Sequence, residues 1–233
     1  MAIITRDAKG APLSHAEMDG NLLELEGHTS GLKLPDTAGA GMKLGDGETY
    51  GWHDLRGSLE RDDVMPAVQA VFIGGLKAFQ FTAEGTQSLY TAVHIPHDYV
   101  PGTDLFIHVH WAHNSATVTG GSVTWGFEAS YAKGHQQAAF SAPVTVSVAQ
   151  SADLARYQHM VAEGALSVSG GSGTQLDTDL IEVDGMILIR LFLDSNDITD
   201  SVTQPDPFAF FVDVHYQSTG MPTLNKSPAF YGA

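Results

Sequence analysis

Histidines crowd one short stretch of this sequence, residues 94–113, which holds five of the eleven histidines in the chain. Two prolines and a glycine interrupt it between residues 96 and 102, as expected for two buried strands joined by a rigid turn. In the second strand, residues 105–112, side chains alternate between the two faces, so His108 and His110 share one face. Such a pair could belong to a metal site or to a polar packing layer.

His108 and His110 match the opening of the cupin signature, in which two histidines one residue apart on a jelly-roll strand bind a divalent metal. His215 and Asp213 share a face of a late strand and could complete a set of ligands for iron or zinc. The match then fails, because residues 111–115 lack the expected glutamate and the second cupin motif is missing. We therefore predict no catalytic residue, no metal and no cofactor, with a histidine–carboxylate packing layer as the simpler arrangement. The candidates for a metal remain His108, His110, Asp213 and His215.

Composition limits the classes of protein to consider. A chain of 233 residues with 43% hydrophobic content can bury one good core, so we expect one domain with a short appendage. The net charge of −16 disfavours nucleic acid and anionic membranes as partners, and no apolar run approaches the roughly 20 residues that cross a bilayer. Without cysteine there is no disulfide or thiol chemistry. The first residues do not resemble a signal peptide, so we expect synthesis in a cytoplasm.

Short strands dominate the chain from residue 67 to residue 233. Each predicted strand is rich in aromatic and β-branched residues, and polar turns separate it from the next. No helical periodicity intervenes, which predicts an all-β protein, an antiparallel β-sandwich of the jelly-roll type. The predicted strands are 78–81, 89–93, 105–112, 123–131, 144–148, 157–161, 186–193 and 208–216.

A helix is predicted near the start, within residues 1–28. Ser14 and Glu17 have the spacing of a capping box, in which each side chain satisfies the other's free backbone N–H. Such a helix has about three turns and needs a partner surface, because isolated helices of this length are marginal in water. The partner could be its own domain, sister chains or a docking platform. The expected contacts are a hydrophobic staple of Leu13 with Met18 and a seam of Met18, Leu22 and Leu25.

Residues 29–66 are rich in Gly, Asp, Thr and Ser and contain few large apolar side chains. This composition is typical of a linker or an extended arm. Trp52 is an aromatic exception, and we expect it to pin the arm to a surface. Arms of this kind often lie across a neighbouring subunit.

Two resemblances connect the chain to phage particles. Residues 11–22, APLSHAEMDGNL, resemble the LTHAEMDANF opening of many tailed-phage fibre and other virion appendage proteins, although Gly20 and Leu22 depart from it. Most of the remaining chain resembles a family of phage structural proteins of about this size. The resemblance implies a trimeric virion component without enzymatic activity, attached through its N-terminus and presenting a β domain outward. The segments that carry the second resemblance are 51–55, 94–99, 131–135 and 213–218.

Three functions remain open at this point, and the tail appendage is favoured because the N-terminal motif is best known there. As a tail fibre or spike, the protein would attach to the tail and reach the host surface and its receptor. As a capsid decoration (cement) or head-fibre protein, it would sit on capsid subunits and stabilise them. The third alternative is a cupin-like metal-binding enzyme. The first two imply other copies of the chain and other virion proteins as partners.

Overall fold

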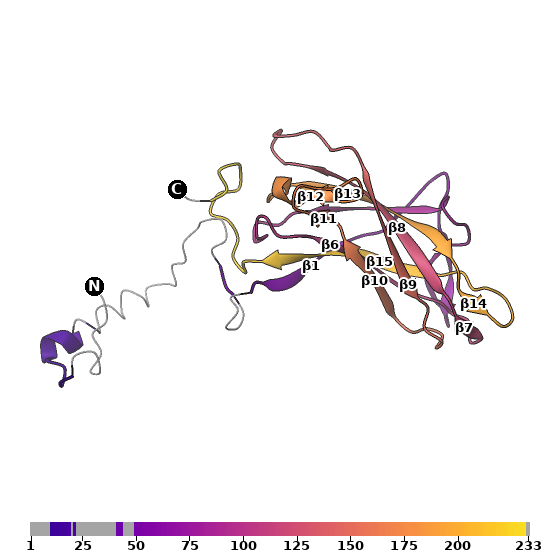
Figure 1. Cartoon of the computed structure of the whole chain (residues 1–233), viewed down its shortest axis with the longest axis horizontal. Helices are drawn as coiled ribbons and strands as arrows, with labels where there is room; N and C mark the ends of the chain where they lie inside the picture. Colours follow the sequence, from indigo (N-terminus) through magenta and orange to yellow (C-terminus); the bar gives the residue numbers. More distant parts are fainter. Residues whose placement is uncertain (1–9, 20, 22–40, 44–48, 232–233) are drawn as a thin grey trace. The chain divides into compact units, whose positions relative to one another are not determined.

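The computed structural model describes residues 10–19, 21, 41–43 and 49–231. Contacts divide the chain into two compact units, Met1–Asp36 and Thr37–Ala233 (Figure 1). Across the described residues, no helix combines the length and the apolar character needed to cross a bilayer. The second unit contains all the strands named below.

In the first unit, the described residues 15–19 and 21 are helical. Its capping box is formed, since the backbone N–H of Ser14 donates to Glu17 Oε2 (2.7 Å) and that of Glu17 donates to Ser14 Oγ (3.3 Å). Met18 is 40% exposed, and Leu13 is half-buried. The predicted seam residues Leu22 and Leu25 lie outside the described residues, so the seam stays a prediction.

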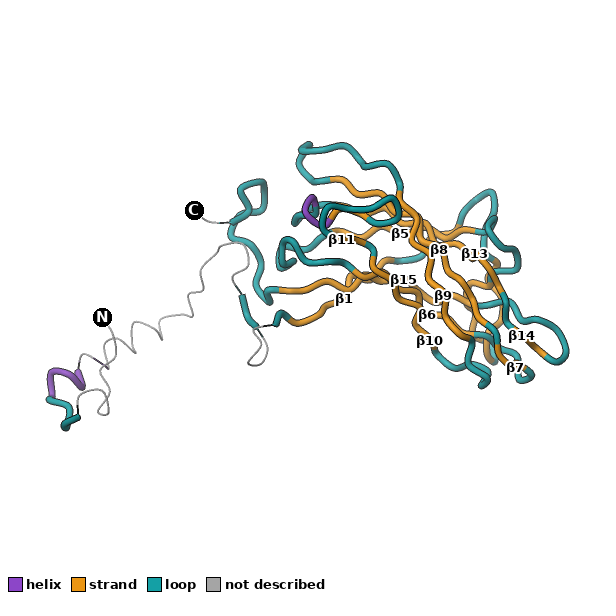
Figure 2. Tube along the Cα trace, in the orientation of Figure 1, coloured by secondary structure: helices purple, strands orange, loops and turns teal. Residues whose placement is uncertain are grey.

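The second unit is a sandwich of two antiparallel sheets (Figure 2). The first sheet runs β10 (Met160–Ala165), β6 (Phe106–Ala112), β15 (Phe208–Ser218), β4 (Leu76–Gln80) and β3 (Val68–Ile73), and β1 (Gly51–Gly57) also pairs with β15. The second runs β2 (Glu60–Arg61), β5 (Ser88–His94), β13 (Met186–Asn196), β8 (Ser122–Ala132) and β9 (Val144–Ser151). Smaller elements are β7 (Val118–Gly120) with β14 (Thr199–Asp200), β11 (Ser167–Val168) with β12 (Leu176–Asp177), and the 3₁₀ turn η1 (Thr178–Leu180).

The strand order is that of a jelly roll. Leaving aside β1, β2 and β3, the orders β4–β15–β6–β10 and β5–β13–β8–β9 interleave along the chain, so successive strands cross repeatedly between the sheets. Two four-stranded sheets connected in this way make the double Greek key of a jelly roll. The predicted all-β, antiparallel, jelly-roll-like sandwich is therefore confirmed.

Alternating side chains build the core between the sheets. Ile107, Val109 and Trp111 of β6 are fully buried, as are Trp125 and Phe127 of β8. The rings of Trp111 and Trp125 meet edge to face across the core, with centroids 6.1 Å apart. Because the odd-numbered residues of β6 fill the core, His108 and His110 occupy the opposite, outer face of the first sheet.

Part of the predicted arm belongs to the sandwich, which corrects the predicted boundary at residue 67. β1 pairs with β15 over its whole length, from Gly51 with Ser218 to Gly57 with Val212, and β2 pairs with β5. The sequence pattern did not predict β1, because an edge strand with one solvent-exposed face needs few apolar residues. The strand predicted at 157–161 is also displaced, since β10 begins at Met160.

Candidate functional site

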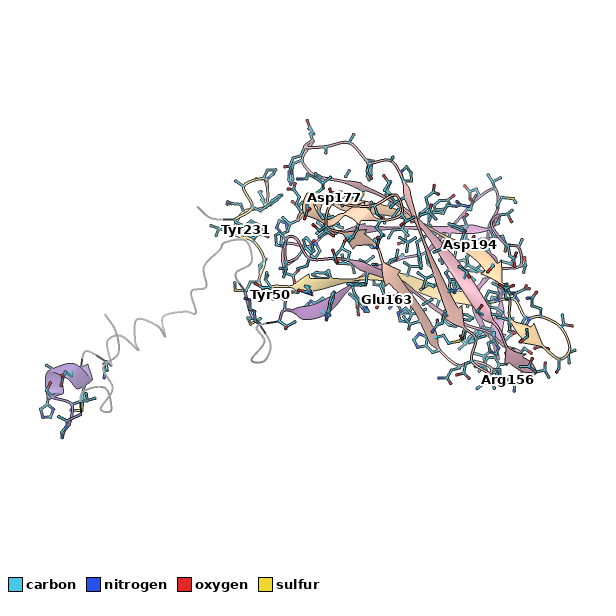
Figure 3. The ribbon with its side chains drawn as sticks, viewed as in Figure 1. Tyr50, Arg156, Glu163, Asp177, Asp194 and Tyr231 are labelled. Carbon is cyan, nitrogen blue, oxygen red and sulfur yellow. The ribbon has the colours of Figure 1, made fainter. Side chains whose placement is uncertain are left out.

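Acidic and histidine side chains line up across three strands on the outer face of the first sheet. Strand register places Glu163 of β10 opposite His108 of β6, and His108 opposite Asp213 of β15. Directly opposed side chains of neighbouring strands lie about 5 Å apart at their Cβ atoms, so these three side chains are in contact range. Glu163 of β10 is labelled in Figure 3. We call His108, His110, Glu163, Asp213 and His215 the sheet cluster.

His108 lies at the centre of the sheet cluster, with its side chain only 2% exposed. Its Nε2 atom contacts Asp213 Oδ1, and its Nδ1 atom lies 3.6 Å from Glu163 Oε2. His110 approaches the same carboxylate, with Nε2 3.3 Å from Asp213 Oδ1. Two imidazoles therefore converge on one buried carboxylate oxygen.

Two rings, those of His159 and Phe211, pack against His110. Its Nδ1 atom lies 2.6 Å from Nε2 of His159, and the two rings are stacked with centroids 4.8 Å apart. The ring of Phe211 also stacks against that of His110, with centroids 4.0 Å apart. Burial lowers the pKa of His110 below its ordinary value, against the opposing effect of Asp213. The neutral form of this imidazole is therefore favoured.

His215 is engaged at both ring nitrogens. Nδ1 lies 2.5 Å from Glu163 Oε2, and Nε2 lies 2.9 Å from Asp54 Oδ1 on β1. His215 thus links three strands through two carboxylates. Beside it is an open hollow of about 410 Å³, lined by Trp52, Phe106, Glu163 and His215.

Among the residues that the structure describes, three buried atoms of the sheet cluster make no hydrogen bond: His108 Nδ1, His110 Nε2 and Asp213 Oδ1. The great majority of buried polar side-chain atoms are hydrogen-bonded, so three such atoms in one cluster require an explanation. Candidate ligand atoms of His108, His110 and Asp213 all lie within 4.8 Å of one another, as do those of His108, Glu163 and His215. The cluster can therefore present two nitrogens and one oxygen to a cation.

The structure brings the four predicted metal candidates onto one face, but it gives them different partners. His108, His110 and Asp213 converge, whereas His215 is paired with two carboxylates. Sequence reasoning missed Glu163 and His159. Val161 and Glu163 are exposed on either side of the buried Ala162. This alternation would have identified Glu163 if the predicted strand had continued beyond residue 161.

Trp52, the predicted anchor, lies on β1 next to the sheet cluster. Its ring meets that of Phe106 edge to face, with centroids 5.5 Å apart, and half of its surface remains exposed. Trp52 therefore contacts the sandwich of its own chain. Its predicted role in attachment or oligomerisation stays a prediction.

A second group of histidines surrounds Asp184 in the loops at one end of the sandwich. We call His94, His97, His135 and Asp184 the loop cluster. Nε2 atoms of His94 and His97 lie 3.2 Å and 3.0 Å from Asp184 Oδ1, and His135 Nε2–H donates to Asp184 Oδ2 at 2.8 Å. Burial acts to raise the pKa of Asp184, but the three imidazoles together hold it below the ordinary value.

Comparison with models of known protein families finds no match, and comparison with curated proteins finds none either. Among solved structures, an isomalto-dextranase of Arthrobacter globiformis T6 complexed with panose aligns with 74% of this chain at 11% identity and a TM-score of 0.35. The alignment covers 24% of that protein. Nothing about activity or substrate follows from so distant a likeness.

Proposed function

We propose that this chain is a structural protein of a tailed-phage particle, without enzymatic activity, attached through its N-terminal segment. The observation that carries the proposal is the N-terminal helical turn. Its sequence resembles the phage attachment opening, and its capping box between Ser14 and Glu17 is formed. Contacts also group Met1–Asp36 as a unit of its own, as suits a segment that docks onto another protein.

Exposed apolar side chains on the sandwich support an assembled state. Val71 and Ile73 on the edge strand β3 are 52% and 41% exposed, and Leu76 of β4, which pairs with Ile73, is 69% exposed. Large apolar groups in one exposed region are typical of surfaces that contact other proteins. Under this proposal, neighbouring virion proteins or sister copies of the chain cover these side chains.

Homotrimerisation through Met18, Leu22 and Leu25 is the expected mode of association. Leu22→Asp places a charge in that seam, so the variant should be monomeric in light scattering while the wild-type protein is trimeric. Ala11→Asp adds the same charge at an exposed position before the helical turn and should leave the mass of the assembly unchanged. A Leu22→Asp protein with wild-type mass would show that this helix is not the seam.

Copy number in purified particles tests the proposed function and separates its two versions. Tens of copies or fewer on a stained, calibrated gel would support the tail appendage, which would also bring the sandwich to the host surface. Hundreds of copies would support capsid decoration. Complete absence from purified particles, with the protein present in infected cells, would overturn the proposal.

A further inference from the structure

Among the described residues, three buried polar atoms of the sheet cluster make no hydrogen bond, although ionisable groups lie close to each of them. His108 Nδ1, His110 Nε2 and Asp213 Oδ1 have no hydrogen bond within the described chain. The side chains of His108 and Asp213 are 2% and 7% exposed, so water does not satisfy them freely. Unpaired buried polar groups are destabilising, and a cation bound to His110 Nε2 and Asp213 Oδ1 would remove the penalty at those two atoms.

We propose that His108, His110 and Asp213 bind one divalent cation of the zinc class, through Nε2 of each imidazole and a carboxylate oxygen. Imidazole nitrogens with one carboxylate oxygen are ligands that suit zinc, whereas calcium and magnesium take oxygen ligands almost exclusively. This proposal departs from the sequence prediction of no cofactor, and it stands independently of the proposed virion function.

The distances within the cluster fit such an ion. In a tetrahedral zinc site with bonds of roughly 2.0–2.1 Å, two ligand atoms lie roughly 3.3 Å apart. His110 Nε2 lies 3.3 Å from Asp213 Oδ1. His108 Nε2 and Asp213 Oδ1 are closer than that and would separate slightly as the ion enters. The fourth position would be left to water.

Supporting groups are also in place. A histidine that binds a metal through one nitrogen generally donates its other N–H to a neighbouring acceptor, which fixes the ring. For His110 that acceptor is His159 Nε2, 2.6 Å from Nδ1. For His108 the carboxylate in reach is Glu163, whose Oε2 lies 3.6 Å from Nδ1, just beyond hydrogen-bond distance. His215 holds Glu163 through the same carboxylate oxygen. Glu163, His159 and His215 are thus positioning residues for the two imidazole ligands.

The alternative occupant of the cluster is a proton shared between His108 and the two flanking carboxylates. Both occupants would link β6 to its neighbouring strands, but only a metal ion can be removed by a chelator and counted. Metal binding by the wild-type protein therefore separates them.

The test uses the full-length chain without a histidine tag, stripped with chelator and then titrated with Zn²⁺ by calorimetry and with Co²⁺ by visible absorption. We expect one equivalent of each ion, cobalt d–d bands typical of a mixed nitrogen and oxygen site, and a higher melting temperature with zinc. A wild-type protein that binds neither ion at concentrations up to about 1 mM, an affinity too weak for a resident metal, would overturn the proposal without reference to any variant.

Variants locate the ion. Replacing a group that supports a ligand weakens metal binding by about 10- to 100-fold, so Glu163→Gln should fall in that range and the ligand change Asp213→Asn should exceed it. His135→Gln in the loop cluster is the matched control and should retain wild-type affinity. Far-ultraviolet circular dichroism of the chelator-stripped variants checks that they are folded. Wild-type affinity in Asp213→Asn, or loss of binding in His135→Gln, would place the ion elsewhere and overturn the assignment.

Discussion

The sheet cluster and the loop cluster both gather histidines around one aspartate, yet they offer different chemistry. Side chains of the proposed ligands in the sheet cluster are 2–14% exposed, whereas the three imidazoles of the loop cluster are 28–55% exposed. In the loop cluster, all three rings approach Asp184, and no atom of the cluster is among the buried polar atoms that lack a partner in the described chain.

The origin of this difference is the backbone that carries each cluster. Neighbouring strands in fixed register bring the sheet cluster together on one face of a sheet. The loop cluster depends on turns, and both His135 and Asp184 adopt positive φ angles, 55° and 60°, that non-glycine residues rarely adopt. A histidine count alone thus says little about metal binding, because the sheet cluster differs from the loop cluster in its buried ligand atoms that make no hydrogen bond within the described residues.

Truncating the core below the sheet cluster should have the largest effect. Trp111 is fully buried on β6 and donates its indole N–H to Gln150 Oε1 at 2.6 Å. Trp111→Ala should lower the free energy of unfolding by about 3–5 kcal/mol in urea denaturation. Phe230 packs against the rings of His97 and His135 near the end of the chain, so Phe230→Ala should lower it less and leave metal binding unchanged. Equal losses would mean that both clusters rest on the same cooperative core.

Removing each central carboxylate should separate the clusters next. Asp213→Ala leaves His108 and His110 buried without their shared partner, which should lower the free energy of unfolding of the metal-free protein by about 1–3 kcal/mol. Asp184→Ala acts on more exposed imidazoles and should lower it by less than about 1 kcal/mol. Chemical denaturation of both chelated variants measures the difference. The reverse order would contradict the view that burial distinguishes the two sites.

Acid should weaken the loop cluster through Asp184. The folded-state pKa of Asp184 lies below the ordinary value of 3.8 because of the three imidazoles, so its contribution to stability is complete above that value. The contribution is lost as the pH falls through the lowered pKa. Between about pH 5 and pH 3, the wild-type protein should therefore lose more stability than Asp184→Asn. Parallel pH profiles for the two proteins, from urea denaturation at each pH, would argue against this coupling.

The smallest effect is expected at the rim of the sheet cluster. Asp54 is 57% exposed and faces His215 Nε2 at 2.9 Å. Exposed ion pairs contribute little, so Asp54→Asn should change the free energy of unfolding by about 0.2–1 kcal/mol and leave zinc affinity nearly unchanged. Loss of zinc binding in this variant would instead assign His215 and its partners a direct place around the ion.

Local patterns in the sequence predicted much of the fold. Alternation identified the faces of β6 and β8 correctly, because every second side chain of a half-buried strand points to the core and is apolar. The same alternation placed His108 with His110, and Asp213 with His215, on common faces. β1 was missed, since its side chains are mostly exposed and only its pairing with β15 makes it a strand.

The partners of the candidate ligands were beyond reach for a related reason. Glu163 and His159 reach His108 and His110 only because β10 lies next to β6, and strand order in a jelly roll is set by contacts between distant parts of the chain. No local spacing records which strand will be the neighbour of which. The sequence therefore predicted the face of the site but not its full membership.

The pairing of β1 with β15 has a mechanical consequence. β1 is where the chain enters the sandwich, and hydrogen bonds between antiparallel strands run perpendicular to the strand axis. Tension applied at Gly51 along that axis loads all seven residue pairs of the ladder in shear at the same time, where tension across the axis would open them one after another. The β1–β15 ladder is thus suited to resist a steady pull on a tether that leaves the domain at this end.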